Sequence, residues 1–293
     1  MNKPAPRDYL TLAFLSLIWG SSYVLIKAGL EVFTPIQVAT LRLSLAALVL
    51  SPLALRYLPR IPRRRWPLLF LTGLTGTAIT SYLFPLAQTR LSSSLTGMLS
   101  GLTPLCTFLI AWLFFRRTAG WRQFLGIALG LLGAVGLAYF APGADGGTSN
   151  VAFVLLVIVC CFCYALSGNL VAEYFADVPA LTVSATSFFM AGLPTIPFLL
   201  FGSGVGETVL DAGTAGWWEL GYVSILAVVS TALCYVIFVR LIQRTGAVFA
   251  STVSYVIPLV ALGWGIAVGE ALSWWQVPAI VLVLIGVFLS KGK

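Results

Sequence analysis

The sequence predicts an all-α integral membrane protein in which ten transmembrane helices form two inverted five-helix repeats around a central cavity. Three observations lead to this fold class. The composition is too apolar for a soluble protein, the chain divides into ten apolar segments of membrane-spanning length, and the two halves of the chain share residues at a constant offset.

The composition sets the class of protein first. Hydrophobic residues make up 59% of the 293 residues and charged residues only 9%, with a mean hydropathy of +1.00. Ordinary soluble domains carry about 25% charged residues. Because a soluble fold of this length could not cover its surface with so few charges, the bilayer is the expected solvent.

Ten apolar segments follow one another along the chain, joined by short linkers rich in Pro, Gly or Arg. A helix needs about 20 residues to cross the hydrocarbon core, and each segment is close to that length. The first segment is too long for the core of a signal peptide, so we interpret it as a spanning helix. The expected segments are 9–30, 35–56, 66–89, 93–115, 121–140, 151–172, 179–201, 217–240, 246–268 and 273–290.

The basic residues indicate the orientation of these segments. With the N-terminus placed in the cytoplasm, 14 of the 17 Lys and Arg residues fall on the cytoplasmic side, and the exceptions are Lys27, Arg42 and Arg90. Cytoplasmic loops of membrane proteins carry such an excess of positive charge. We therefore expect a multi-pass protein of the cytoplasmic (inner) membrane of a bacterium, with both termini in the cytoplasm. The net charge of +8 is explained in the same way, without a nucleic-acid partner.

The second half of the chain repeats the first. Matches offset by 153 or 154 residues are Tyr82 with Tyr235, Arg90 with Arg244, Pro104 with Pro258, Trp121 with Trp274, Gln123 with Gln276, and Gly133 with Gly286. We expect an N-terminal repeat over 1–145 and a C-terminal repeat over 146–293. Because each repeat holds an odd number of helices, the second must insert in the opposite orientation. Inverted repeats of this kind are common in secondary transporters, whose substrate site lies near the midplane between the repeats.

At this point the sequence resembles the EamA-type families of the drug/metabolite transporter superfamily, over nearly the whole chain. In the second half, nothing matches Lys27 or Arg42. The residues that carry the resemblance are Trp19-Gly20-Ser21-Ser22-Tyr23, Lys27, Pro35, Arg42, Tyr82, Pro104, Gly126, Gly130, Gly133, Pro258, Gly269-Glu270, Trp274 and Gly286. The resemblance implies ten helices, a central cavity and export of metabolites or amino acids.

Candidate site residues are polar, aromatic or helix-breaking side chains placed near the middle of a segment. A proline frees a backbone carbonyl and bends its helix. Pro104 and Pro258, together with the mid-segment Gly20, are therefore candidate hinge or gating residues. A purely structural kink is the alternative explanation. For each aromatic or hydroxyl residue, packing is the alternative explanation. The candidate substrate-binding residues are Trp19, Tyr23, Arg42, Tyr82, Ser100, Thr103, Tyr164, Asn169 and Tyr255.

Charged residues inside the membrane are costly and therefore informative. Arg42 could bind a substrate carboxylate, which its planar fork fits well; the alternative is a structural ion pair of Arg42 or Lys27 with Glu31. All nine Asp and Glu residues lie near segment ends or in linkers. A proton-coupled pump for cations usually needs a buried acid, so we expect neutral, zwitterionic or weakly anionic substrates that move by exchange or downhill efflux.

The sequence offers no chemistry for an enzyme, a metal or a cofactor. It contains no histidine, and its five cysteines all lie within apolar segments, where they are expected to pack as small apolar residues. Neither a buried acid pair nor a nucleophile with a base is recognisable. We expect no cofactor and no metal. The glycines of segment 121–140 are expected to pack against the tenth segment, and both a monomer and a homodimer remain open.

These observations lead to one functional expectation and one alternative. The protein is expected to export small metabolites, chiefly amino acids or similar amphipathic or aromatic solutes, by alternating access. The alternative is a flippase or efflux carrier for lipids or lipophilic drugs. A channel would need a ring of filter residues, and two inverted halves favour alternating access instead.

Overall fold

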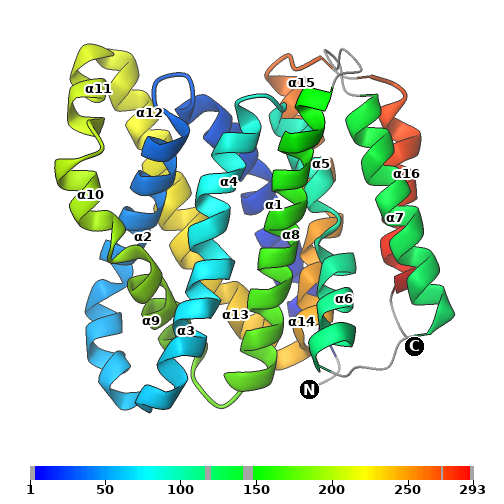
Figure 1. The fold of residues 1–293 in the computed structure, drawn as a ribbon, viewed down its shortest axis with the longest axis horizontal. Coiled ribbons are helices and arrows are strands. Elements are labelled where there is room, and N and C mark those ends of the chain that lie inside the picture. The colour runs from blue at the N-terminus through cyan, green and yellow to red at the C-terminus, as the bar shows by residue number, and fades with distance from the viewer. Residues whose placement is uncertain (1–3, 116–119, 141–147, 272, 291–293) are drawn as a thin grey trace.

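A computed structural model describes residues 4–115, 120–140, 148–271 and 273–290, and within these ranges the regular elements are all helices (Figure 1). The elements in chain order are α1 (Pro6–Gly29), α2 (Pro35–Tyr57), η1 (Leu58–Arg60), η2 (Arg63–Arg65), α3 (Trp66–Gly73), η3 (Leu74–Ala78), α4 (Ile79–Gln88), α5 (Ser93–Ser100), α6 (Thr103–Phe115), α7 (Trp121–Tyr139), α8 (Thr148–Tyr174), α9 (Ala180–Gly192), α10 (Thr195–Phe201), α11 (Val205–Asp211), α12 (Thr214–Ile225), η4 (Leu226–Leu233), α13 (Cys234–Thr245), α14 (Ala247–Ala250), η5 (Ser251–Tyr255), α15 (Ile257–Ala267) and α16 (Gln276–Ser290).

Seven of the helical stretches among the described residues are long and apolar enough to cross a membrane: Pro6–Gly29, Pro35–Arg60, Arg63–Gln88, Ser93–Phe114, Val151–Tyr174, Thr214–Thr245 and Ala247–Ala267. The pair α9 and α10, bent by 49°, makes an eighth if it forms one broken span. The chain is therefore a multi-pass membrane protein. The expected fifth and tenth segments correspond to α7 and α16, whose described apolar stretches, Phe124–Leu137 and Gln276–Gly286, are shorter. Ten crossings thus remain a prediction, and the expected repeat boundary at 145 lies outside the described residues.

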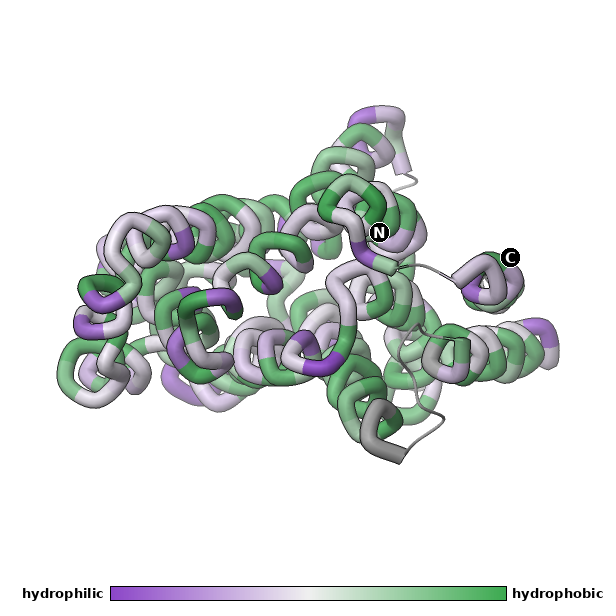
Figure 2. Tube along the Cα trace, turned by 90° about the horizontal axis from the view of Figure 1, so that it is seen from above, coloured by the Kyte–Doolittle hydropathy of each residue, from purple (hydrophilic) through white to green (hydrophobic). Residues whose placement is uncertain are grey.

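The exterior of the helix bundle is apolar. Large hydrophobic side chains stand exposed along it, among them Leu10 at 73%, Phe201 at 88% and Phe288 at 69% exposure. Hydrophobic residues cover most of the length of the helices when the molecule is viewed from above (Figure 2). In water such a surface would drive aggregation, whereas lipid tails solvate it.

Many buried hydroxyl groups form hydrogen bonds within their own helices. Thr72, Thr107 and Thr186 each donate to the backbone carbonyl four residues earlier, at 2.7–2.8 Å. In hydrocarbon an unpaired polar group costs several kcal/mol, on the order of 2–7 by transfer. Back-bonding of this kind allows serine and threonine to occupy interior positions without partners on other helices.

Regular α-helix is interrupted at four places in the middle of the bundle. The segments η3 and η4 are π-helical and widen the turns between α3 and α4 and between α12 and α13. Gly101 and Leu102 separate α5 from α6, and the 3₁₀ segment η5 separates α14 from α15. The prolines expected to kink continuous helices, Pro104 and Pro258, instead lie in the first turns of α6 and α15. The missing N–H of proline is tolerated at such a helix start.

Helices α7 and α16 pack closely against each other at one edge of the molecule (Figure 1). The contact depends on glycine, as expected from the sequence. A Cβ atom on Gly133 would come within 2.7 Å of the Ala279 carbonyl oxygen. A Cβ atom on Gly286 would meet the backbone of Gly126 and Gly130. Small residues allow such close approach of membrane helices, which is then stabilised by van der Waals contact.

Polar contacts at the two ends of the bundle tie segments that are far apart in the sequence. Asp8, almost fully buried, forms an ion pair with Arg244 (3.2 Å) and joins the start of α1 to the end of α13. Arg65 forms a bidentate pair with Asp177 (2.9 and 2.7 Å), and this hydrogen bonding lowers the pKa of the Asp177 carboxyl.

At the opposite end of the bundle, Glu270 caps the start of α5. Its Oε1 atom accepts bonds from the backbone N–H and hydroxyl of Ser93 (both 2.7 Å), and its Oε2 atom accepts bonds from the N–H (3.0 Å) and hydroxyl (2.5 Å) of Ser94. Burial raises the pKa of this carboxyl, but the bonds from Ser94 and Ser93 outweigh burial and hold the pKa below its ordinary value. A negative charge is also favoured by the dipole at a helix start.

We predict that Gly286→Ala destabilises the protein by about 1–3 kcal/mol, because the added methyl group meets backbone atoms that cannot move aside. The measurement is the thermal unfolding midpoint of the purified protein in detergent. Gly263→Ala is the matched control, since a Cβ there meets nothing within 4 Å. Equal midpoints for the two variants would contradict the close α7–α16 packing.

We predict that Glu270→Gln destabilises the protein at neutral pH, by on the order of 1–3 kcal/mol for charged hydrogen bonds. A glutamate whose pKa is lowered by folding stabilises the fold above its unfolded pKa of about 4.3 and loses this effect as the pH falls through the folded value. The difference in unfolding midpoint between the wild type and Glu270→Gln should therefore shrink on acidification. The exposed Glu207→Gln serves as control. A difference that grows as the pH falls would overturn this explanation.

Candidate functional site

A cavity lies in the middle of the bundle, between α1, α2, η3, α4, the α5–α6 break, α8, η4, α13 and the α14–η5–α15 stretch. The π-helical segments η3 and η4, the α5–α6 break and the 3₁₀ segment η5 all line the cavity or border it. The lining residues are Trp19, Ser22, Tyr23, Ile26, Arg42, Gly76, Thr77, Phe84, Ser100, Thr103, Thr107, Tyr164, Gly168, Ser230, Thr231, Tyr235, Phe238, Ala247, Ser251, Val253, Ser254 and Ile257. Six are aromatic and nine are Ser or Thr, a mixture typical of a site for an amphipathic ligand.

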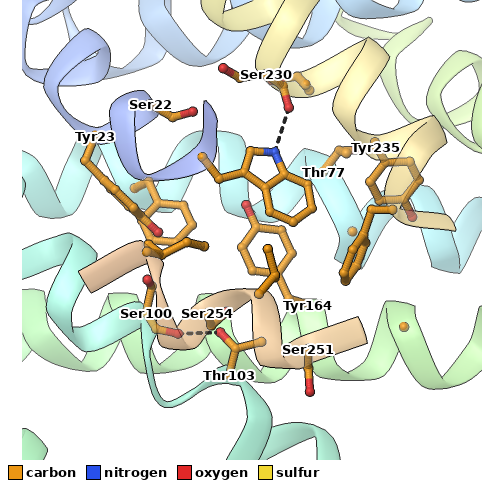
Figure 3. A pocket seen from close by; sticks show the side chains of 18 of the residues that line it. Ser22, Tyr23, Thr77, Ser100, Thr103, Tyr164, Ser230, Tyr235, Ser251 and Ser254 are labelled. Carbon is orange, nitrogen blue, oxygen red and sulfur yellow. Dashed lines mark hydrogen bonds between the residues drawn. The ribbon is translucent and has the colours of Figure 1, made fainter. Parts of the chain in front are cut away.

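The π-helical segment η4 supplies a backbone partner for Trp19. The indole Nε1 of Trp19 donates to the Ser230 carbonyl at 2.8 Å, a bond visible in Figure 3. The ring also meets Phe238 edge to face, with centroids 4.9 Å apart. These two contacts fix the orientation of the indole at the cavity wall and connect α1 to the α12–η4–α13 stretch.

Arg42 is a buried cation on the same wall, with 7% of its surface exposed. It lies about two turns into α2, and its Nε donates to the Thr231 hydroxyl at 2.7 Å. Thr231 in turn donates to the Leu226 carbonyl at 2.9 Å, which holds the hydroxyl in place. The expected alternative, an ion pair with Glu31, is not formed by Arg42 or by Lys27 in the described part of the chain. Lys27 donates instead to the Gln88 carbonyl at 2.9 Å.

A series of aromatic contacts forms another side of the cavity. Tyr23 meets Phe84 edge to face at 5.5 Å, and Phe84 stacks on Tyr164 at 5.9 Å. In the view of Figure 3, Tyr23 and Tyr235 lie on opposite sides of the cavity and Tyr164 lies between them. Tyr164 also interacts electrostatically with Arg42. The cation and the aromatic wall therefore adjoin.

Hydroxyl groups from the two helix breaks lie together on the wall opposite Trp19. Figure 3 shows Ser100, Thr103 and Ser254 close to one another in this view. Ser100 donates to the Gly97 carbonyl at 2.6 Å and Thr103 to the Ser100 carbonyl at 2.7 Å. These bonds occupy the donors, so the hydroxyl oxygens present acceptor lone pairs to a ligand.

Six of the nine candidate binding residues predicted from the sequence line this one cavity: Trp19, Tyr23, Arg42, Ser100, Thr103 and Tyr164. Tyr82, Asn169 and Tyr255 do not. The Tyr82 hydroxyl is directed to Thr40 (3.4 Å), and the Asn169 amide donates to the Thr107 and Ala165 carbonyls (3.1 and 2.9 Å). Tyr255 is half-buried beside the lining residue Ser254.

The three candidate hinge residues border the cavity without lining it. Gly20 allows α1 to approach α15, because a Cβ there would come within 2.5 Å of the Val260 Cβ atom. Pro104 and Pro258 follow the two helix breaks. Their positions are compatible with hinges, and the role itself stays a prediction.

Sequence reasoning missed the contribution of the π-helical segments. Thr77 and Thr231, together with Gly76, Ser230 and Tyr235, all line the cavity and come from or directly follow η3 and η4. A signal was present, because Thr77 and Thr231 are separated by the same offset as Pro104 and Pro258. Single-turn π-helical insertions occur frequently at functional sites.

The chemistry of the wall is simple. Arg42 is the one charged side chain among the described residues that line the cavity. Among the described residues, no group of three or more Cys, Asp or Glu side chains could hold a metal ion. The arrangement can therefore bind a small solute through apolar contact, hydrogen bonds and one positive charge.

Comparison with known proteins places the chain in a family. The model of the EamA-like transporter family matches residues 8–139 and 152–291. The uncharacterized transporter YdfC of Bacillus subtilis is 26% identical, with 100% of this chain and 91% of that protein covered. The inner membrane transporter YedA of Escherichia coli is 28% identical, with 95% and 91% covered. The S-adenosylmethionine/S-adenosylhomocysteine transporter of Chlamydia trachomatis is 26% identical, with 92% and 84% covered.

The fold is also found among solved structures. A crystal structure matches 98% of this chain and 97% of its own with a TM-score of 0.68 at 18% identity. The helical architecture is therefore an established one. Together with the family match over both halves of the sequence and relatives named as transporters, it shows that this multi-pass membrane protein belongs to the EamA-like transporter family.

Proposed function

We propose that the protein is a secondary transporter that exports small metabolites, chiefly amino acids or similar amphipathic and aromatic solutes, from a bacterial cell. The observation that carries the proposal is the cavity itself. It adjoins the four interruptions of regular helix in the middle of the bundle, and its wall combines six aromatic rings, nine Ser or Thr side chains and one buried cation. An apolar pocket with a few convergent polar groups is typical of small-ligand sites.

Alternating access between two inverted halves is the mechanism we propose. In this arrangement residues 1–145 and 146–293 form the two repeats, ten helices cross the inner membrane, and both termini lie in the cytoplasm. The pairs Thr77–Thr231 and Pro104–Pro258 support it, because each half contributes a π-helical segment and a broken helix at matching positions. Broken helices at the midplane are typical of the substrate sites of secondary transporters.

The named relatives support a metabolite as substrate. S-adenosylmethionine and S-adenosylhomocysteine, for which the chlamydial relative is named, each combine an amino-acid group with an aromatic base. A cavity with an arginine and an aromatic wall suits solutes of that general design. At 26% identity this likeness supports the class of solute and does not transfer the compounds themselves.

We predict that the protein, reconstituted in liposomes preloaded with labelled phenylalanine, releases it with saturable kinetics. Arg42→Gln should reduce the rate at least about tenfold, because it removes a charged hydrogen-bonding partner worth roughly 1.5–3 kcal/mol. Trp19→Ala should also slow release, since the indole forms part of the wall.

Exposed residues away from the cavity provide matched controls for these variants. Arg240→Gln and Trp218→Ala change the same residue types on the surface, and release should be unchanged. If no amino acid is released while labelled lipid or lipophilic compounds move, the proposal fails. The alternative, a flippase or efflux carrier for lipids or lipophilic drugs, then takes its place.

We predict that release does not depend on a pH gradient. Proton coupling needs a titratable group that alternates between the two sides, and the cavity wall among the described residues contains no acid. The measurement compares efflux from liposomes with an internal pH of 7 and an external pH of 6, 7 or 8. Rates within a factor of about two are expected, and a proton flux coupled to solute release would contradict the prediction.

A further inference from the structure

Among the described residues, no carboxylate pairs with the cation of the cavity wall. Asp8 and Asp177 are paired with Arg244 and Arg65. Glu270 is held by Ser93 and Ser94. Arg42 donates from Nε to Thr231 and also interacts with Tyr164, and both partners are neutral. A buried guanidinium without a counter-ion is unfavourable, and a bound anion would relieve this.

Arg42 is held through its Nε atom and lines the cavity. Thr231 holds Nε in place, and Thr231 is itself fixed by the Leu226 carbonyl. The guanidinium therefore faces the cavity in a defined orientation, next to Tyr164. Its two terminal nitrogens provide the parallel pair of donors that a carboxylate accepts in bidentate fashion.

A cationic group finds no equivalent partner. The described lining residues include no Asp or Glu, so a substrate ammonium could interact there with hydroxyl groups or aromatic faces, and Arg42 would repel it. A substrate carboxylate, in contrast, would be attracted by the charge of Arg42 and could accept charge-assisted hydrogen bonds from its guanidinium. The acid group of a substrate is therefore recognised much more strongly than its amino group.

We propose that the cavity selects small monocarboxylate anions with an aromatic or apolar body, that Arg42 binds the carboxylate, and that an α-amino group is not required. The inference rests on the proposed transport function and defines its substrate class. The carboxylate lies at Arg42 and Tyr164, and the apolar body packs against Trp19, Tyr23 and Phe84. An amino acid then binds through its carboxylate, and its ammonium group is not needed for binding.

Three probes of similar shape separate the two charges of an amino acid. They are 3-phenylpropionate, which has only the acid, phenylalanine, which has both groups, and phenylalaninamide, which has only the amine. Binding to the purified protein in detergent is measured by ligand-induced shift of the unfolding midpoint and by titration. Each unlabelled probe is then tested as an external inhibitor of labelled phenylalanine exchange in liposomes.

We expect 3-phenylpropionate to bind at least as tightly as phenylalanine, and phenylalaninamide at least about tenfold more weakly than either. Arg42→Gln should weaken 3-phenylpropionate at least about tenfold and should not weaken phenylalaninamide, whose ammonium group is no longer repelled. Arg240→Gln, on the surface, should change neither. Because each variant is compared across probes, a general loss of folding would appear as equal loss for all three.

The outcomes separate this inference from the proposed function. Equal binding of phenylalaninamide and 3-phenylpropionate overturns the inference even if phenylalanine is transported. So does equal weakening of both by Arg42→Gln when the ligand-free unfolding midpoint of that variant matches the wild type. Selective binding of the carboxylates without any exchange supports the inference and overturns the proposed transport of these solutes. Binding of none of the probes overturns both.

Discussion

The requirement that every backbone polar group be satisfied in a solvent without hydrogen bonds underlies the rest of this structure. It explains why the regular elements are helices throughout the described residues, and why hydroxyl groups such as those of Thr72 and Thr186 bond back to their own helices. It also restricts where a helix can be irregular. At membrane depth, wide π-turns and breaks are tolerated only beside protein or a cavity. Here η3, η4 and both broken helices adjoin the same cavity. The constraint that requires helical backbone in the membrane thus also indicates where the candidate site lies.

Charge is distributed under the same constraint. Most charged residues lie near the ends of the bundle, where Asp8 pairs with Arg244, Arg65 pairs with Asp177, and Glu270 caps α5. Arg42 is the exception, buried inside the bundle and held by a neutral hydroxyl group. Because burial of a charge is costly, a cation in this position needs a function that offsets its cost. Ligand recognition is such a function. Among the described residues, no carboxylate pairs with Arg42 to give it a structural role instead.

The sequence was sufficient to predict the membrane class, the helical segments and part of the cavity. Hydropathy reports directly on the solvent, which is why the class follows from composition, and a residue such as Arg42 or Trp19 inside an apolar segment is conspicuous. The rotational position of a side chain is harder to predict. Helices that are apolar on all sides show no periodicity that would distinguish a position facing the cavity from one facing a neighbouring helix. The sequence therefore predicts Tyr82 and Asn169 as cavity residues. In the structure Tyr82 contacts Thr40, and Asn169 contacts Thr107 and Ala165. Tyr235 lines the cavity while Tyr82, its counterpart in the repeat, does not.

Helices α7 and α16 differ from the others, since none of their described residues lines the cavity. Their close contact through glycine joins a helix of the first half of the chain to a helix of the second half. Van der Waals packing of this kind holds membrane helices together. The pair can therefore stay assembled as one fixed edge while the helices around the cavity change their packing.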